Sequence, residues 1–253
     1  MPEVAEVKIT KDFLNCELES QIVSEFVFFS GQYINKDPPG YKQFAKCLPM
    51  LVESVETKGK FMYITFYNDD TRYYLLHSMR LTGSWSLEET PYSRWYIELY
   101  NGKKIWFEDS RCLATLKFTK DRSEVERYLA KLGPDILSNE FTKAIWSVLI
   151  KANWNKNITA FLMDQSIISG CGNYIKAEAL YKAGIAPTRK VYSLDEEECV
   201  KLFRALRKIP RLVYMGGDIS KEKFQMKIYR KDWATKMKTA DGRTTYWDPK
   251  VQS

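Results

Sequence analysis

The first residues of the chain combine an amine and a carboxylate in a spacing suited to covalent chemistry. Removal of Met1, which a following proline permits, would leave Pro2 with a secondary amine and the Glu3 carboxylate one peptide bond away. An amine that attacks a sugar C1′ forms an iminium, which is Schiff-base catalysis, and a neighbouring carboxylate can carry the protons. An α-amino group also has a lower pKa than lysine, so more of it is unprotonated at neutral pH. The sequence therefore predicts a nucleophile at Pro2 with Glu3 as general acid or base.

The stretch SGCGNYIKAEALYKAGI is the most specific pattern in the chain. Gly170 and Gly172 free the backbone to approach a phosphate closely, and Asn173 stands at the start of a helix whose N-terminal amides favour anions. Taken by itself, the pattern fits a phosphate clamp and also an ordinary glycine turn between two packed helices.

Composition indicates a globular protein with one or two cores. The chain has 253 residues, of which 45% are hydrophobic and 14% aromatic. No stretch approaches the ~20 apolar residues of a membrane span and the start lacks a signal-peptide pattern, so we expect an intracellular protein without membrane contact. Five cysteines without a Cys-x-x-Cys pair, and a single histidine, His77, predict free thiols and no metal site.

Positive charge is concentrated near the end of the chain. Residues 201–253 hold 14 basic and five acidic residues, whereas the first 200 hold 25 and 27. Aromatic residues are interspersed in this basic region, which favours a folded module over a solvated tail. A basic, aromatic module is suited to binding the phosphates of a nucleic acid.

Hydrophobic periodicity divides the chain into two halves, a β-rich half and a helical half, which would position the candidate residues. Residues 3–19 have the spacing of an amphipathic helix, and alternating β-branched and aromatic residues up to about 120 predict antiparallel hairpins. The expected fold class is α+β: an N-terminal antiparallel β-sandwich with flanking helices, then a helical domain ending in a β-hairpin. We expect domains at 1–121, 122–209 and 210–253.

The second half is predicted to be helical up to Ile209. Helical patterns occur in EVERYLAKL, FTKAIWSVLIKA, ITAFLMDQ, NYIKAEALYKAGI and SLDEEECVKLFRALRKI. Ser193, with Glu196 three residues later, is the expected cap of the last helix. From Pro210 onward the pattern changes to short strands, first KFQMKIYRK and then MKTADGRTTYW around an Asp-Gly turn.

Several motifs occur in the order found in one known family. They are the first three residues, LGPDIL, LMDQSIISGCGNYIKAEALYKAGI and DGRTTYW. Over essentially the whole chain the sequence resembles the Fpg/Nei family of DNA glycosylase/AP lyases, and it is most similar to the endonuclease VIII (Nei-like) branch. The resemblance implies base excision repair of oxidised bases through a proline Schiff base followed by β,δ-elimination. It also implies damaged DNA, duplex or single-stranded, as the partner of a monomer that needs no cofactor.

The resemblance assigns roles to four residues near the reacting sugar. Pro2 matches the family nucleophile, and Glu3 matches the adjacent carboxylate that protonates the opening sugar. Glu6 matches the second acidic residue of the opening motif, and Lys60, in TKGKFMYI, matches a lysine that contacts the phosphate near the lesion.

Three further residues are expected to bind DNA. Asn173 matches the phosphate-binding asparagine of the helix-two-turn-helix motif, and Arg243 matches the arginine at the tip of the C-terminal finger hairpin. Lys156 is also expected to bind DNA. A lesion that is flipped out by ~180° requires its backbone to be held on both sides, so phosphate contacts of this kind are needed.

Two loops are candidates for the wedge that fills the vacated base stack. The segment RLTGSW resembles the wedge loop of the Nei-like branch, which makes Leu81 the inserted residue, flanked by Arg80 and Thr82. The segment EDSRCLA could instead supply Arg111 and Leu113, as in the Fpg branch. We favour Leu81.

The chain departs from the family pattern at both ends. Its opening is Pro-Glu-Val-Ala-Glu in place of Pro-Glu-Gly-Pro-Glu, so the two acids keep their spacing while the turn residues are lost. Of the four cysteines that bind zinc in other members, the final pair is replaced by Asp248 and Val251, and the first pair is absent around Asp232 and Ala234. A finger without zinc must be held by packing of aromatic residues, namely Tyr229, Trp233 and Tyr246.

These departures leave two function classes open. The favoured class is an active bifunctional glycosylase, and the alternative is a catalytically weak relative that binds damaged DNA. A general RNA-binding module is disfavoured, because the sequence lacks the single-strand stacking signature of such modules. The segment PRLVYMGGDISKEK before Phe224 is too short for the long loop with which Fpg-branch members cap 8-oxoguanine. We therefore expect oxidised pyrimidines, ring-opened purines and hydantoins to be preferred substrates.

Overall fold

The computed structural model describes residues 2–69, 71–216 and 224–253, which form two compact units. The first unit contains Pro2 and Glu6–Ala130, and the second contains Glu3–Ala5 and Lys131–Ser253. Met1, whose removal the sequence predicts, lies outside the described residues. None of the helices in the described ranges has an apolar stretch long enough to span a bilayer.

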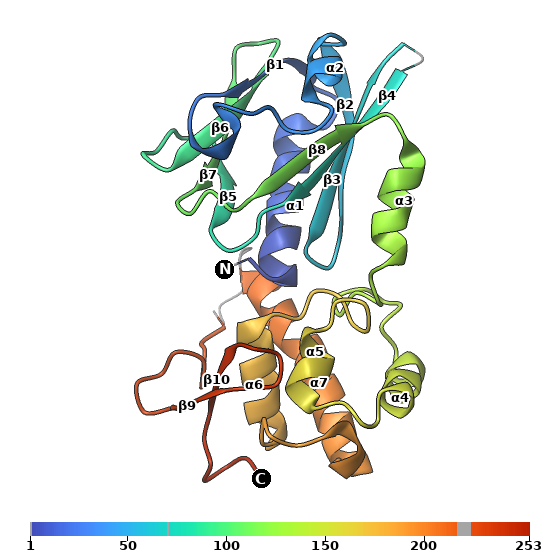
Figure 1. The fold of residues 1–253 in the computed structure, drawn as a ribbon, viewed down its shortest axis with the longest axis vertical. Helices are drawn as coiled ribbons and strands as arrows, with labels where there is room; N and C mark the ends of the chain where they lie inside the picture. Colours follow the sequence, from blue (N-terminus) through green and yellow to red (C-terminus); the bar gives the residue numbers. More distant parts are fainter. Residues whose placement is uncertain (1, 70, 217–223) are drawn as a thin grey trace. The chain divides into compact units, whose positions relative to one another are not determined.

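The described part of the first unit is built on an antiparallel sheet of eight strands (Figure 1). The strands are β1 (Ile22–Phe28), β2 (Met50–Lys58), β3 (Phe61–Asn68), β4 (Thr71–Ser78), β5 (Gly83–Ser86), β6 (Ser93–Leu99), β7 (Lys104–Asp109) and β8 (Thr115–Thr119). They pair in the order β5-β7-β6-β1-β2-β3-β4-β8. The helices are α1 (Val4–Leu18), α2 (Tyr41–Ala45) and α3 (Arg122–Ala130), with a 3-10 turn at Gly31–Tyr33.

One face of the sheet packs on the main core of the unit, and a smaller cluster of Tyr63, Tyr74, Leu76 and Val125 lies apart from it. Residues alternate between buried and half-buried along β6 and β7, as expected for strands with one face on a core. Trp85 donates a hydrogen bond to His77 (3.3 Å). Trp85 lies on β5, the first strand in the pairing order, and His77 lies on β4, the last strand but one. Trp95 and Phe107 stack in the same core with ring centroids 4.1 Å apart. The predicted α+β class is confirmed.

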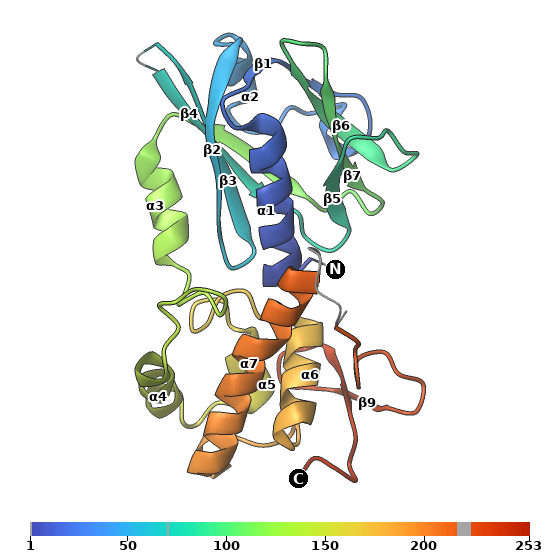
Figure 2. The same ribbon diagram turned by 180° about the vertical axis from the view of Figure 1, so that it is seen from behind.

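In its described residues, the second unit consists of four helices and a hairpin (Figure 2). The helices are α4 (Lys143–Ala152), α5 (Ile158–Met163), α6 (Asn173–Ala183) and α7 (Glu196–Gly216), with a 3-10 turn at Val191–Ser193, and the strands are β9 (Thr235–Lys238) and β10 (Thr244–Trp247). Helices α6 and α7 pack side by side, and α6 is buried along nearly its whole length. The α5–turn–α6 segment is the helix-two-turn-helix expected from the sequence.

Helix α7 differs from the prediction at both ends. Its capping box is formed by Asp195 and Glu198, each side chain accepting from the other's backbone amide (2.8 and 2.9 Å). Ser193 belongs instead to the preceding 3-10 turn. The helix also continues through Pro210 to Gly216. A proline inside a helix removes one backbone hydrogen bond, and here Pro210 is buried.

The strand predicted for KFQMKIYRK is wrong for its described part. The backbone amides of Lys227, Ile228 and Tyr229 all donate to the carboxylate of Glu178 on α6, at 2.8 to 2.9 Å. Amides that are occupied by a carboxylate are not available for a strand ladder. Over the described residues, the hairpin therefore contains β9 and β10 without a third strand.

The single histidine gives the first unit a pH-dependent stability. His77 is buried, its Nδ1 lies 3.2 Å from the Thr115 carbonyl, and its Nε2 accepts from Trp85, which fixes a neutral ring protonated at Nδ1. Burial lowers the pKa of His77 from its ordinary 6.5 to about 4, although Thr115 and Asp109 oppose the shift.

We expect the free energy of unfolding to fall as the pH drops from 6.5 to about 4. In this window the unfolded chain binds a proton at this histidine and the folded chain does not, so the loss amounts to about 3 kcal/mol. Below about pH 4 this residue should add no further pH dependence. His77→Gln should remove the part of this slope that the histidine contributes, which urea unfolding of both proteins across this range will measure. An identical pH dependence in the variant would contradict the assignment.

A candidate active site at the start of helix α6

The Glu3 carboxylate is seated on the first amides of helix α6. Its side chain is fully buried, Oε1 accepts from the Tyr174 amide (2.9 Å) and Oε2 accepts from the Ile175 amide (3.2 Å). First-turn amides have no partner within their own helix, and the positive end of the helix dipole favours a negative charge. Gly172, the N-cap residue, has no side chain to satisfy them. Glu3 therefore caps α6 through both of its carboxyl oxygens.

Both glycines of the turn make room for the start of the chain. A Cβ on Gly172 would lie 2.1 Å from the Glu3 Cδ atom, and a Cβ on Gly170 would lie 2.7 Å from the Val4 Cβ atom. Gly170 also has a φ of +98°, and its carbonyl accepts from the Val4 amide (3.2 Å). The sequence offered these glycines as a phosphate clamp or an ordinary turn, and the structure adds that Glu3 and Val4 occupy the space beside them.

Gln165, in the LMDQ motif, holds this turn in shape. Its Nε2 donates to the carbonyls of Met163 (3.1 Å) and Cys171 (2.9 Å), and its Oε1 accepts from the Gly170 amide (3.0 Å). One amide side chain thus satisfies three backbone groups around the glycines. The motif was visible in the sequence, but this positioning role was not.

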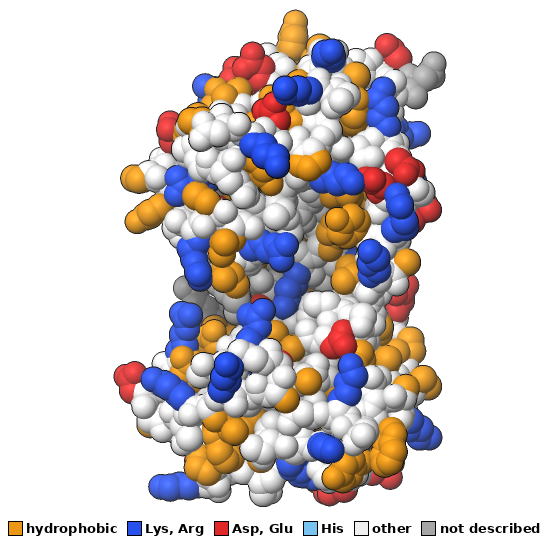
Figure 3. Space-filling view, in the orientation of Figure 1, with side chains coloured by type: hydrophobic (Ala, Val, Ile, Leu, Met, Phe, Trp, Pro, Cys, Tyr) orange, Lys and Arg blue, Asp and Glu red, His pale blue; other side chains and the backbone are white. Residues whose placement is uncertain are grey.

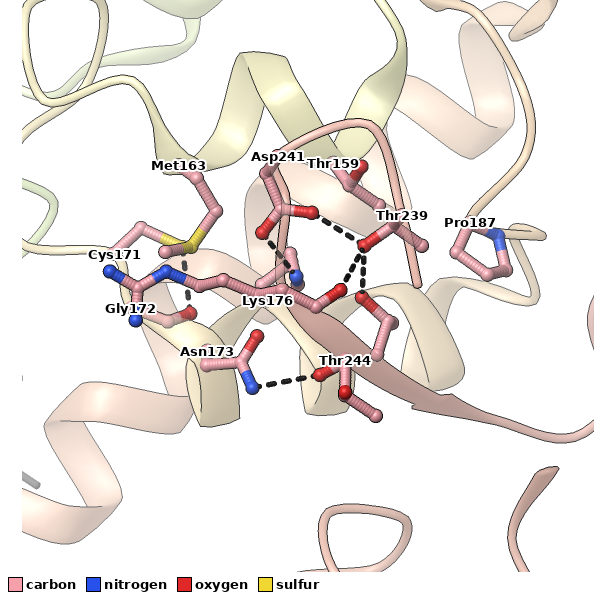
Figure 4. Close-up of polar contacts among 12 residues, drawn as sticks. Thr159, Met163, Cys171, Gly172, Asn173, Lys176, Pro187, Thr239, Asp241 and Thr244 are labelled. Atoms are coloured by element: carbon pink, nitrogen blue, oxygen red, sulfur yellow. Dashed lines mark hydrogen bonds and ion pairs between the residues drawn. The ribbon is translucent and has the colours of Figure 1, made fainter. Parts of the chain in front are cut away.

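Asn173 lies where α6 contacts the hairpin (Figure 4). Asn173 Nδ2 donates to the carbonyl of Thr244 (2.9 Å), the residue that follows the exposed Arg243. Asn173 Oδ1 is buried without a hydrogen-bond partner among the described residues. Glu3, Asn173 and Arg243, which are far apart in sequence, are thus gathered around the N-terminal turn of α6 and the hairpin that it holds.

The remaining candidate in the second unit, Lys156, lies in the segment between α4 and α5. Its Nζ pairs with Asp164 Oδ2 at 2.9 Å. Figure 3 shows other Lys and Arg side chains spread over the visible face of this unit, with few acidic ones among them. This surface agrees with the excess of basic residues in the C-terminal sequence.

The other catalytic candidates belong to the first unit. Pro2 is half-buried and directly precedes Glu3. Glu6 is half-buried in the first turn of α1. Lys60 is half-buried in the turn between β2 and β3, after Gly59, whose φ is +58°.

Asp109 connects the two candidate wedge loops. It lies buried at the end of β7, accepts from the Thr82 hydroxyl, and also accepts from the amides of Arg111 (3.2 Å), Leu113 (2.6 Å) and Ala114 (2.7 Å). Burial alone would raise the pKa of Asp109, but these hydrogen bonds outweigh it and lower the pKa. Sequence reasoning missed Asp109, although an acid that ends a strand directly before a candidate loop was a usable signal.

Both loops contain a residue in the left-handed region that is not glycine. Arg80 has a φ of +56° and Cys112 a φ of +52°. Such residues cost about 1 kcal/mol or more and tend to occur at functional sites. Leu81 is half-buried in its loop, whereas Leu113 is 39% exposed. The geometry leaves both apolar candidates at the surface of the first unit.

Comparison with known proteins identifies the family. The formamidopyrimidine-DNA glycosylase N-terminal domain matches residues 1–116, and the formamidopyrimidine-DNA glycosylase H2TH domain matches residues 132–234. Formamidopyrimidine-DNA glycosylase from Thermus thermophilus is 30% identical over 220 residues, which cover 86% of this chain and 78% of that protein. Its counterpart from Desulfitobacterium hafniense is 32% identical over 216 residues, covering 81% and 76%.

A solved structure has the same fold. Lactococcus lactis Fpg in complex with DNA containing an abasic site superposes with a TM-score of 0.82 over 100% of both chains, at 19% identity. This likeness is one of fold: a β-sheet domain followed by a helix-two-turn-helix and a hairpin. The chain belongs to the formamidopyrimidine-DNA glycosylase (Fpg/Nei) family and is a DNA glycosylase with abasic-site lyase activity. Enzymes of this family act on oxidised bases in base excision repair.

Gly172→Ala should selectively impair base excision. The φ of Gly172 is −127°, which alanine adopts readily, so the substitution acts only through the clash of its Cβ with Glu3. Because the carboxylate must leave the α6 amides, we expect single-turnover excision to fall by ~10²-fold or more, the lower range for a lost general acid or base.

Gly102→Ala is the matched control. A Cβ at Gly102 would meet nothing within 4 Å, so any effect there reflects backbone strain alone. Full excision activity in Gly172→Ala would show that Glu3 does not depend on this position.

Proposed function

We propose that this glycosylase uses Pro2 as its nucleophile and Glu3 as its proton carrier. The observation that supports this most strongly is the buried Glu3 carboxylate, held at both oxygens by α6 directly after Pro2. Two hydrogen bonds restrict the carboxylate to one orientation. A proton carrier that is fixed one residue from the amine gives the short, ordered transfer that general acid-base catalysis requires.

The proposed reaction begins at the sugar C1′. The Pro2 nitrogen forms a bond to C1′ while the bond from C1′ to the damaged base breaks, and the base leaves with the bonding electrons. The proton released by the amine passes to Glu3 and then to the ring oxygen as the sugar opens to an iminium. Loss of a C2′ proton expels the 3′ phosphate, a second elimination expels the 5′ phosphate, and hydrolysis of the Schiff base frees Pro2. Glu6 assists as the second acid of the opening motif.

We further propose that damaged DNA is held through its phosphates by Lys60, Asn173 and Arg243, with Lys156 as an additional contact. The exposure of Arg243, and its position next to the residue that Asn173 binds, support this grouping. Cations and amides at phosphates fix the register of the strand without reading its sequence. Such contacts suit an enzyme whose target is a lesion and not a base sequence.

Leu81, flanked by Arg80 and Thr82, is our proposed wedge. The Thr82 hydroxyl bond to Asp109 supports it, because it gives the short loop a rigid base from which to insert a side chain. Arg111, on the second loop, depends on the same carboxylate. The two loops are therefore proposed to act together, with the first supplying the apolar side chain.

The hairpin fits the metal-free finger of a Nei-like enzyme. The rings of Tyr229 and Tyr246 pack with centroids 5.2 Å apart, and Trp233 lies 6.4 Å from Tyr181 on α6. Within the described ranges, no three His, Cys, Asp or Glu side chains gather as metal ligands would. These aromatic contacts support our proposal that packing replaces the metal of related fingers.

Borohydride trapping tests the nucleophile. With abasic-site DNA, the protein lacking Met1 should form a covalent adduct that peptide mapping places on Pro2. A version with extra residues before Pro2 should form none, because its proline nitrogen is an amide.

An adduct on Lys60 would refute the assignment of Pro2. Binding of abasic-site DNA without any covalent adduct would also refute it, because the reaction would then not pass through a Schiff base at Pro2.

We expect oxidised pyrimidines to be excised well ahead of 8-oxoguanine. The expectation rests on the short sequence before Phe224, of which residues 217–223 lie outside the described residues. Without a capping loop, a purine lesion loses hydrogen bonds that are worth about 1–3 kcal/mol each, or roughly ten- to a hundredfold in discrimination. Single-turnover rates for 5-hydroxyuracil, thymine glycol, hydantoins and 8-oxoguanine will measure it. Equal rates for 8-oxoguanine and 5-hydroxyuracil would overturn this preference.

A further inference from the structure

A buried ion pair joins α6 to the tip of the hairpin (Figure 4). Lys176 Nζ lies 2.7 Å from Asp241 Oδ2, and the two side chains are 0% and 3% exposed. Removing two charges from water is costly, and an apolar pair of similar volume often stabilises a fold as well or better. Stability alone therefore does not explain why this position holds an ion pair.

The hydrogen bonds of Asp241 lead to the backbone of Arg243. The second oxygen of Asp241 accepts from the hydroxyl of Thr239, which also lies 2.7 Å from the hydroxyl of the buried Thr245. The Thr239 amide in turn donates to the Arg243 carbonyl (3.0 Å). Thr239, Thr245 and the Asp241 side chain are buried and their hydrogen bonds are directional, so a shift of Asp241 would change the backbone that carries Arg243.

Three charged groups interact at this point. Burial lowers the pKa of Lys176, the bond to Asp241 opposes that shift, and the nearby charge of Arg243 lowers the pKa further. Arg243 is thus close enough to be repelled by Lys176, and Asp241 provides the compensating negative charge.

We propose that Lys176 is a positioning residue for DNA binding: through Asp241 it sets the β9–β10 turn that presents Arg243 beside Asn173. This inference rests on the phosphate-binding role proposed above for Arg243. Lys176 is buried and does not itself contact DNA. The ion pair supplies the fixed geometry that cysteines and zinc supply in the metal-bearing fingers of the family.

Non-additivity of two substitutions tests the proposal. Lys176→Met, Arg243→Ala and the double variant are compared for binding to duplex DNA that carries a tetrahydrofuran abasic analogue, over a series of salt concentrations. We expect each single variant to bind about tenfold more weakly and with a salt slope reduced by about one. The double variant should bind no more weakly than Arg243→Ala, because the lysine acts only through the arginine.

The controls separate positioning from general stability. Lys176→Arg should restore most of the binding, and Lys182→Met, which removes an exposed charge from the same helix, should leave it near that of the unmodified protein. If Lys176→Met does not fold, Asp241→Asn, which keeps the side-chain shape, takes its place in the same comparison.

Two results would overturn the inference and can be told apart. If Arg243→Ala binds normally, the proposed phosphate contact fails and the positioning role fails with it. If Arg243→Ala binds weakly but the loss from Lys176→Met adds to it in full, Lys176 is only structural and the proposed role of Arg243 stands.

Discussion

The hydrogen bonds between the Glu3 carboxylate and the first amides of α6 are the constraint on which the candidate site depends. They require a glycine at position 172, because any side chain there would occupy the space of the carboxylate. They require a tight turn before the helix, which Gln165 maintains. These hydrogen bonds also restrict where Pro2 can lie, because Pro2 is the residue immediately before Glu3. The N-terminus of α6 has no side-chain cap of its own, and the Glu3 carboxylate is buried. Each therefore supplies the hydrogen-bond partner that the other needs.

Helix α6 organises the C-terminal segment through buried polar side chains. Asn173 binds the carbonyl of Thr244, Lys176 binds Asp241, and Glu178 binds three successive amides before the hairpin. Buried polar groups are costly unless they are paired, so α6 cannot be covered until this segment is in place. The helix and the hairpin should consequently form as one cooperative structure, although little regular secondary structure connects them.

The sequence predicted the features that depend on local periodicity and short spacing. Alternation in residues 50–119 indicated the hairpins, and the start of α1 was located correctly. Residues 227–229 were missed because their amides bind Glu178, a partner 49 to 51 residues away, and no local pattern encodes such a contact. The role of the glycines was missed for the same reason, since what occupies the space beside them comes from the other end of the chain.

Two kinds of contact hold the hairpin, and they make different contributions. Strands of four residues are too short to be stable alone, so most of the stabilisation must come from packing of Tyr229 and Tyr246 against the helix. Apolar packing is non-directional, however, and tolerates small shifts of the chain. A buried, charge-assisted hydrogen bond at 2.7 Å tolerates them less, because it weakens steeply when its distance and angle change. The aromatic rings can therefore keep the hairpin attached while Lys176 and Asp241 fix the position of its tip, and a tip that must meet a phosphate needs both.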